Sequence, residues 1–327
     1  MGIGQIPDGG GSERSDPKTE RELTIEVARL YYYEELTQDA IGSVLGISRQ
    51  KVWRLLSRAR EDGIVQVRVM EPETDLELRE EELKKRYALK EVRLARIFSN
   101  DEKVIQKRIA QVAASYLRSR VEPYMTLGIS YGKTLFEMTR YLAPRQVPGL
   151  RVVQIMGGYG KLKGEVMAIE LARRIAACFD GDVIYLLAPA FARDRMTRDA
   201  ICQENSVLLP LDIGRKADMA LVGIGGTTPT STLLDTGDIH EAEMRILARG
   251  GAVGNICGHF YDQKGRLVPS PADERCISLE LSELQRIPLV IGVAGGTEKF
   301  KAIQGALAGR LVNVLITDEG TMKKLLD

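Results

Sequence analysis

The chain has 327 residues, long enough for two folded domains, and combines 44% apolar with 28% charged residues, which excludes a largely disordered chain. Its formal net charge of +1 excludes neither nucleic acid nor a metabolite as a ligand. No apolar run approaches the roughly 18 residues of a membrane span, and residues 1–20 are too polar for a signal peptide, so we expect a cytoplasmic protein with no membrane partner.

Residues 1–19 are rich in Gly, Ser and Asp and are expected to form a disordered tail. A helical pattern starts at Glu20 and predicts a first helix that ends near Glu35. Its apolar positions, at steps of three and four, are Leu23, Val27, Leu30 and Tyr31. A second helix is predicted after Thr37, a good N-cap residue. The residues expected on its inward face are Ile41, Val44 and Leu45.

A tight turn is predicted between this second helix and a third. Gly46 supplies the positive φ that the turn needs, Ile47 is expected in the core, and Ser48 caps the third helix. The third helix is predicted over Arg49–Asp62. Its inward residues are Val52, Leu55, Leu56 and Ala59. Because Gly42 lets the two helices cross closely, the spacing is that of a helix-turn-helix.

The outward face of the third helix is basic, with no acidic residue between Ser48 and Arg60. Such side chains contact phosphates and base edges, so the domain over residues 20–70 is predicted to bind double-stranded DNA. A solvated basic face on an ordinary helical bundle is the alternative. The predicted DNA-binding residues are Thr37, Gln38, Ser48, Arg49, Gln50, Lys51, Arg54 and Arg58. Trp53 is expected to pack beneath the helix, the alternative being contact with the sugar-phosphate backbone.

A short strand or wing is predicted over residues 64–70, where apolar and polar residues alternate. Residues 71–88 are then predicted to form an acidic linker helix that opens with a capping box at Thr74 and Glu77. Its apolar residues are Leu76, Leu83 and Tyr87. They suit a dimer seam and docking on the second domain equally well.

Short apolar strands alternate with helices over residues 89–327, which predicts an α/β domain with a Rossmann-like parallel sheet covered on both faces. The predicted strands are Tyr124–Ser130, Arg151–Met156, Asp182–Leu187, Met219–Ile224, Leu289–Ala294 and Val312–Thr317. The predicted helices are Lys133–Leu142, Glu165–Phe179, Arg193–Glu204, Glu241–Arg249 and Glu298–Leu307. In such sheets ligands bind beyond the carboxyl ends of the strands.

Glycines follow four of these predicted strands. Residues 128–134 read GISYGKT, and the free N–H groups, hydroxyls and helix start of this loop suit a phosphate, although it lacks the spacing of a P-loop. Further glycine pairs stand at 157–158, 223–226 and 295–296. Four such turns in one domain predict a shared ligand pocket, and Lys299, just after the last pair, is expected to direct its ammonium at the same anion.

Catalytic and metal chemistry find little support. Asn255 can donate to and accept from sugar hydroxyls, but the two histidines, His240 and His259, have no metal-ligand spacing. No GxSxG motif or plausible triad is evident, and the four cysteines have no zinc or redox spacing, so we expect reduced core cysteines, no metal and no cofactor. These pocket residues can hold a ligand but include no acid pair to move protons, which favours a sensor over an enzyme.

Seven ordered segments resemble the SorC family of sugar-binding bacterial transcription regulators. They are LTQDAIGSVLGISRQKVWRLLSRAREDGIVQV from Leu36, GISYGKT, VQIMGG at 153–158, LLAPA at 186–190, ADMALVGIGG at 217–226, GAVGNICGHFYDQKG at 251–265, and VAGGTEKFKAI through NVLITDE at 293–319. The resemblance covers the chain from about Arg21 to its C-terminus. It implies an effector domain similar to the glucosamine-6-phosphate deaminase and ribose-5-phosphate isomerase fold.

The resemblance also implies a function: effector binding alters operator affinity, in a homodimer or homotetramer. GISYGKT would hold the phosphate of a sugar effector through Ser130, Gly132, Lys133 and Thr134, assisted by Lys299. Asn255 stands where members usually have an acidic residue, and His259 where many carry Arg. The full predicted effector site is Gly128, Ser130, Tyr131, Gly132, Lys133, Thr134, Gly157, Gly158, Gly223, Gly225, Asn255, His259 and Lys299.

We therefore predict a transcriptional regulator, not an enzyme, controlled by a phosphorylated sugar. The alternative is a sugar-phosphate isomerase or deaminase with an accessory DNA-binding domain.

Overall fold

A computed structural model describes residues 20–65, 74–99, 101–158, 162–228 and 231–327, apart from the side chains of 74–75 and 162–167. The chain divides into two compact units, residues 1–71 and 72–327, which are considered one at a time. Of the wing predicted over residues 64–70, residues 66–70 lie outside the described residues, and Ile64 and Val65 form no strand.

Within residues 20–65, the first unit contains three helices, α1 (Glu20–Tyr32), α2 (Gln38–Leu45) and α3 (Arg49–Glu61). Its small core is built from side chains of all three, namely Val27, Ile41, Val52, Leu55 and Leu56. The first helix ends earlier than predicted, at Tyr32. Val44 was predicted to face inward, but its side chain is 64% exposed, because Ile41 and the partly buried Leu45 already supply the buried face of this short helix.

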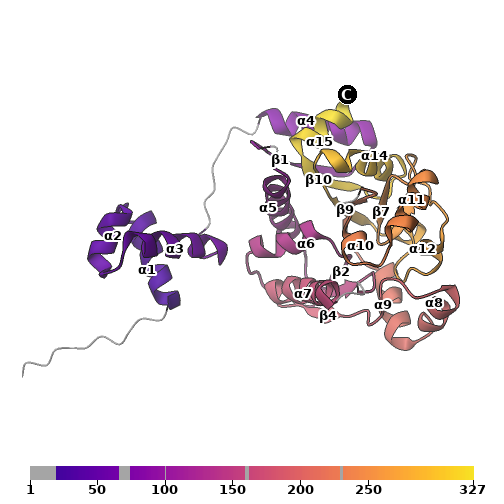
Figure 1. The fold of residues 1–327 in the computed structure, drawn as a ribbon, viewed down its shortest axis with the longest axis horizontal. Helices are drawn as coiled ribbons and strands as arrows, with labels where there is room; N and C mark the ends of the chain where they lie inside the picture. Colours follow the sequence, from indigo (N-terminus) through magenta and orange to yellow (C-terminus); the bar gives the residue numbers. More distant parts are fainter. Residues whose placement is uncertain (1–19, 66–73, 100, 159–161, 229–230) are drawn as a thin grey trace, which may run out of the picture. The chain divides into compact units, whose positions relative to one another are not determined.

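The predicted linker helix is α4 (Thr74–Tyr87), and it packs on the second unit. Leu83 is fully buried, and Leu76 and Tyr87 pack against the same core. The Tyr87 hydroxyl donates to the carbonyl oxygen of Leu325 at 3.1 Å, near the C-terminus beside which α4 lies in Figure 1. Docking on the second domain therefore accounts for the apolar face of this helix.

A seven-stranded parallel sheet forms the centre of the second unit, in the order β1-β10-β9-β5-β2-β3-β4. Its strands are β1 (Glu91–Ala95), β2 (Thr126–Ile129), β3 (Arg151–Gln154), β4 (Asp182–Ile184), β5 (Met219–Gly223), β9 (Leu289–Val293) and β10 (Val314–Asp318). All six predicted strands are present in shorter form. The edge strand β1 was not predicted.

Helices cover both faces of this sheet (Figure 1). They are α5 (Glu102–Arg120), α6 (Lys133–Met138) with a following 3-10 turn (Thr139–Tyr141), α7 (Leu162–Phe179), α8 (Arg195–Ile201), α9 (Asn205–Arg215), α10 (Thr232–Asp235), α11 (Glu241–Arg249), α12 (Pro271–Glu274), α13 (Leu281–Leu284), α14 (Phe300–Ala308) after a 3-10 turn (Thr297–Lys299), and α15 (Glu319–Leu326). Of these, α5, α9, α10, α12, α13 and α15 were not predicted.

Two hydrophobic cores lie on the two faces of the sheet. Alternate residues of a strand enter opposite cores, as Leu315 joins one and its neighbours Val314 and Ile316 the other. One core receives α5 and α7, and the other receives α4, α9, α11, α14 and α15. This two-sided burial explains why the strands read as continuous apolar runs. The α/β fold with a parallel sheet is confirmed.

A small antiparallel sheet sits beyond the large one and consists of β6 (Gly225–Gly226), β7 (Gly254–Ile256) and β8 (His259–Tyr261). Cys257 and Gly258 join the last two strands in a tight turn, both with positive φ, 52° and 81°. Such a turn matches the twist of a two-stranded hairpin. The hairpin carries Asn255 and His259, two residues of the predicted effector site.

Candidate functional site

The turn between α2 and α3 has the geometry predicted for it. The Thr37 hydroxyl accepts a hydrogen bond from the Ala40 N–H at 3.3 Å, and the Ser48 hydroxyl accepts one from the Lys51 N–H at 3.2 Å, so both helices are capped. Gly46 ends α2 with φ 64°. A methyl group on Gly42 would lie 2.7 Å from the Ile47 carbonyl oxygen, which shows how closely the turn passes this helix.

The outer face of α3 is exposed and basic. Arg49 pairs with Asp39 at 3.6 Å, and Arg58 pairs with Glu20 at 2.8 Å and with Asp62 at 3.4 Å. The hydrogen bond from Arg58 to Glu20 raises the pKa of the guanidinium. Among the residues the structure describes, no ion pair is found for Lys51 or Arg54, which leaves their charges open to an anion outside the unit.

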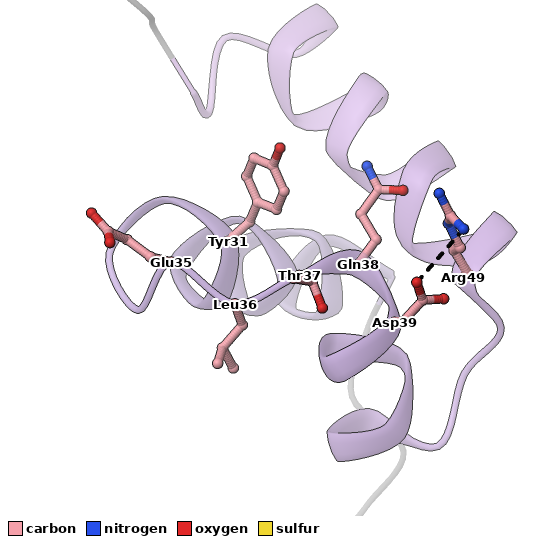
Figure 2. A pocket seen from close by; sticks show the side chains of 7 residues that line it. All are labelled: Tyr31, Glu35, Leu36, Thr37, Gln38, Asp39 and Arg49. Atoms are coloured by element: carbon pink, nitrogen blue, oxygen red, sulfur yellow. Dashed lines mark ion pairs between the residues drawn. The ribbon is translucent and has the colours of Figure 1, made fainter.

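An open hollow of about 430 Å³ lies beside this face, between the end of α1 and the start of α2. Its lining residues are Tyr31, Glu35, Leu36, Thr37, Gln38, Asp39 and Arg49. Figure 2 shows the ion pair between Arg49 and Asp39 at one side of the hollow, near the Gln38 amide. The hollow is therefore lined by three of the predicted DNA-binding residues, Thr37, Gln38 and Arg49.

Trp53 does not pack beneath α3. Its side chain is 55% exposed, whereas Val52, Leu55 and Leu56 fill the core beneath the helix. The prediction of a packed indole is therefore wrong, because position 53 lies outside the buried stripe that these residues form at helical spacing.

In the second unit, the carboxyl ends of β2 and β5 carry the first part of the predicted effector site. Residues 130–132 leave β2 and enter α6 at Lys133. The buried Ser130 hydroxyl accepts a hydrogen bond from the Gly223 N–H at 3.2 Å and bonds to the Cys257 thiol, which ties the loop to β5 and to the hairpin turn. Tyr131 and Thr134 are also buried.

Two lysines from distant parts of the chain influence each other electrostatically near this loop. Lys133 donates to the carboxylate of Asp235 in α10 at 2.6 Å. Lys299 is half-buried, and its pKa is lowered first by that burial and then by the positive charge of Lys133. Asp235 also raises the pKa of the Tyr131 phenol, after burial, which is the larger cause. The charge of Lys133 thus acts on Lys299, and Asp235 is a residue that the sequence did not reveal.

The loop before Lys299 is held by the start of α15. The Gly296 N–H donates to Asp318 Oδ2 at 2.8 Å and to the Thr321 hydroxyl at 3.1 Å, and the Thr321 hydroxyl donates to Asp318 Oδ2 at 2.6 Å. All three residues are buried. The glycine pair 295–296 therefore serves a rigid connection after β9, held in place by Asp318 at the end of the neighbouring strand β10. An acidic residue directly after a strand was the available signal for Asp318.

Asn255 lies beside the glycine of the neighbouring strand. Its side chain is 8% exposed, and its Nδ2 has no hydrogen-bond partner among the described residues. A methyl group on Gly225, its register partner in β6, would lie 2.6 Å from Nδ2. A buried amide donor without a partner costs free energy, about 1–3 kcal/mol, so a bound acceptor would be stabilising at this point.

His259 is enclosed by protein partners. Its Nδ1 lies 2.5 Å from Asp273 Oδ1, and its Nε2 lies 3.0 Å from the Ser278 hydroxyl. These contacts form an Asp-His-Ser chain between residues 14 and 19 positions apart, across a turn that no motif in the sequence marks. Ser278 Oγ also lies 2.8 Å from the Cys257 carbonyl oxygen, so the chain clamps the hairpin turn.

The glycines at 157–158 have a different environment. The Gly157 N–H donates to the Ile277 carbonyl and the Gly158 N–H donates to the Ala188 carbonyl, at 3.0 and 2.9 Å. A side chain at Gly157 would collide with the carbonyl of Pro189. These N–H groups are therefore occupied, and the glycines allow close packing of two chain segments. Gly128 packs against Ile155 within the sheet in the same way.

The described residues contain no group of three or more His, Cys, Asp or Glu side chains arranged to hold a metal ion. Within the same residues, no helix is long and apolar enough to cross a membrane. Cys257 and Cys276 are buried free thiols, and burial raises the pKa of both.

Comparisons with known proteins agree with both units. The family model described as "Putative sugar-binding domain" matches residues 71–327, and the model of sigma-70 region 4 matches residues 21–62. The deoxyribonucleoside regulator of Bacillus subtilis (strain 168) is 32% identical over 310 residues, covering 95% of this chain and 99% of that protein. Transcriptional regulator LsrR of Enterobacter sp. (strain 638) is 33% identical over 315 residues, 94% of each chain.

Among solved structures, the full-length sorbitol operon regulator SorC of Klebsiella pneumoniae matches with a TM-score of 0.75 and 30% identity, covering 95% of this chain and 100% of that one. These relatives are regulators, not enzymes, so the alternative of an isomerase or deaminase is set aside. The chain therefore belongs to the SorC family of sugar-binding transcriptional regulators, in which a sugar effector controls a DNA-binding helix-turn-helix.

Proposed function

We propose that the effector of this regulator is a phosphorylated sugar whose phosphate binds between the GISYGKT loop and Lys299. The carrying observation is that the Lys133 and Lys299 ammonium groups are close enough for one to lower the pKa of the other. Two like charges at a half-buried point are unfavourable, and a bound anion relieves the repulsion. Hydrogen bonds to a charged group contribute about 1.5–3 kcal/mol each.

Asp235 supports the same proposal. In this structure its carboxylate occupies Lys133 at 2.6 Å, in the position that an anionic ligand would compete for. Both side chains are about half exposed, at 48% and 55%, so their pairing is weak enough to exchange. The incoming phosphate would thus replace one carboxylate contact with contacts to two lysines.

The sugar itself would be recognised by Asn255. Its unpartnered amide donor suits a hydroxyl or carbonyl oxygen of the ligand. The absence of a side chain at Gly225 makes room for the Asn255 amide, which would lie 2.6 Å from a methyl group at this position. We infer that His259, with both ring nitrogens engaged, fixes the shape of this part of the pocket through Asp273 and Ser278.

A set of contacts leads from the loop before Lys299, through α15, to the linker helix α4. Asp318 and Thr321 hold Gly296 at the start of α15, and the carbonyl oxygens of Leu325 and Leu326 at its end accept hydrogen bonds from Tyr87 and Arg86 in α4. We propose that effector binding shifts α15 and thereby changes how α4 presents the DNA-binding unit. The coupling would be tested by cutting the contact at Tyr87.

On the DNA side, the proposed contacts to bases and phosphates are made by the exposed residues of α3, chiefly Gln50, Lys51 and Arg54, with Thr37 and Gln38 at the start of α2. One such unit offers a small contact area, so we propose a cytoplasmic homo-oligomer whose paired units read two half-sites about one helical turn, or a multiple, apart.

Calorimetry with matched pairs of sugars tests the effector proposal. The protein is titrated with several pentose and hexose phosphates and with the same sugars lacking phosphate. A ligand present at one hundred times its Kd should also raise the free energy of unfolding by about 2.7 kcal/mol. Equal affinity for a sugar and its phosphate ester would remove the phosphate site.

A further inference from the structure

Trp53 is the largest exposed apolar side chain of α3 and the only tryptophan of the chain. An indole that is 55% exposed contributes little to the core beneath it, which Val52, Leu55 and Leu56 fill. Burying an exposed aromatic surface is favourable and an aromatic ring supplies much of the contact energy where it meets a partner. The side chain of Trp53 is therefore available to contact a partner outside this unit.

The neighbours of Trp53 identify the chemistry of that partner. In a helix, residues three and four positions apart share a face, so Trp53 lies with Gln50 and Arg49 on one side and is followed by Arg54. The side chains of Arg49, Gln50 and Arg54 are all exposed. No acidic residue lies between Ser48 and Arg60, so the charges around Trp53 on this helix are all positive. A polyanion with apolar surfaces between its charges fits well, and double-stranded DNA has this character.

The position of the indole on the helix narrows the contact further. Residues at the buried stripe, such as Val52 and Leu56, point into the core, and the side opposite carries Gln50 and Arg54. Trp53 stands on the flank between the two, one turn beyond Arg49, whose guanidinium reaches Asp39 in the first turn of α2. This is the flank on the side of α2, and in a helix-turn-helix that first helix crosses the sugar-phosphate backbone.

We propose that Trp53 contacts the wall of the major groove: its ring packs against deoxyribose, and its Nε1–H donates to a backbone phosphate. This inference rests on the proposed DNA contacts of α3 and adds a residue that reads no base. It positions α3 in the groove, since contacts to the backbone set the register of a protein on DNA without reading its sequence. The indole is neutral, so it adds no displaced counterion to binding.

The experiment uses the full chain and two DNA probes. One is a pool of random-sequence duplexes, and the other is a set of duplexes that the protein has selected from that pool. Binding is measured by the anisotropy of labelled DNA. The environment of Trp53 is measured by its own emission and by quenching with acrylamide, a neutral molecule that the charge of the DNA does not repel. On binding either probe, the emission should move to shorter wavelength and quenching should fall.

Variants separate the contact from a change in folding. Trp53→Ala should weaken binding of both probes about tenfold and by the same factor, since a hydrogen bond to a charged group and the ring contact are lost. The DNA affinity of Trp53→Phe should lie between those of the wild-type protein and Trp53→Ala, and circular dichroism should show that all three proteins are folded. A matched control moves the tryptophan to another position. In Trp53→Phe combined with Tyr33→Trp, the indole replaces a side chain that is 80% exposed near the end of α1, and its emission should not respond to DNA.

The outcomes are distinct. If DNA binds while the emission of Trp53 is unchanged and Trp53→Ala binds within twofold of wild type, the inference is wrong and the DNA-binding function stands. If Trp53→Ala weakens only the selected duplexes, Trp53 contacts a base and the backbone assignment is wrong. If the wild-type protein binds neither probe, the proposed DNA contacts fail and the inference fails with them.

Discussion

Replacing Gly42 with alanine probes the contact that shapes the helix-turn-helix. The added methyl group would lie 2.7 Å from the Ile47 carbonyl oxygen and 3.6 Å from the Arg49 nitrogen, both of them backbone atoms that cannot rotate away. Overpacking of this kind costs about 1–3 kcal/mol, whereas alanine gains about 0.5–1 kcal/mol over glycine inside a helix. The net expectation is a loss of about 1–2 kcal/mol in a unit with a small core.

Urea unfolding followed by Trp53 emission measures this loss in the first unit, because the second unit contains no tryptophan. A small domain loses about 1 kcal/mol per molar urea, so the midpoint for Gly42→Ala should fall by about 1 M or more, and DNA affinity should fall as α3 is displaced. Ser43→Ala is the matched control, since Ser43 is exposed on the same helix and bonds only to the Asp39 carbonyl. A midpoint for Gly42→Ala at or above that of the control would refute the close-approach argument.

Four further predictions concern the second unit. Lys299→Ala should weaken binding of a phosphorylated effector about ten- to a hundredfold, and Thr134→Val somewhat less, because the backbone donors remain; calorimetry on both would show wild-type affinity if the phosphate lies elsewhere. Because the pKa of Lys299 is lowered, its charge is lost at a lower pH than for an ordinary lysine, so affinity should decline as the pH rises through that value. Asp235→Asn removes the carboxylate that competes for Lys133 and should tighten phosphate binding a few-fold, with no change expected for the unphosphorylated sugar; weaker binding would place Asp235 among the ligand's own contacts. Tyr87→Phe removes a hydrogen bond to Leu325 of about 1 kcal/mol and should shrink the effector's influence on DNA affinity while leaving effector affinity within twofold, an outcome checked by anisotropy titrations with and without effector.

The sequence predicted best those features that depend on local backbone chemistry. The caps at Thr37 and Ser48 and the left-handed Gly46 are short-range requirements, and each is present where the spacing placed it. The glycine loops after the strands were found for the same reason. The strand β1 was missed because Glu91 and Arg93 interrupt its apolar run, although Val92 and Leu94 are buried.

Contacts between distant segments were beyond reach. No motif connects His259 to Asp273, Lys133 to Asp235, or Gly296 to Asp318; each pairing is created when the chain folds. Trp53 was misplaced for a different reason. A large aromatic residue is usually buried, and only its register relative to Val52 and Leu56 shows that this one is not.

If a phosphorylated sugar controls the affinity of this protein for DNA, an anisotropy titration should detect the change. The affinity of the full-length protein for duplexes that it has itself selected is measured by anisotropy, alone, with each sugar phosphate of the panel, and with the corresponding free sugar. At least one sugar phosphate should change the affinity about fivefold or more, as coupled sites of this kind do, whereas its free sugar should not. Lys299→Ala should bind DNA normally, and its DNA affinity should not respond to the ligand. A ligand that changes DNA affinity equally with and without its phosphate, and equally in Lys299→Ala, would contradict control by a phosphorylated sugar.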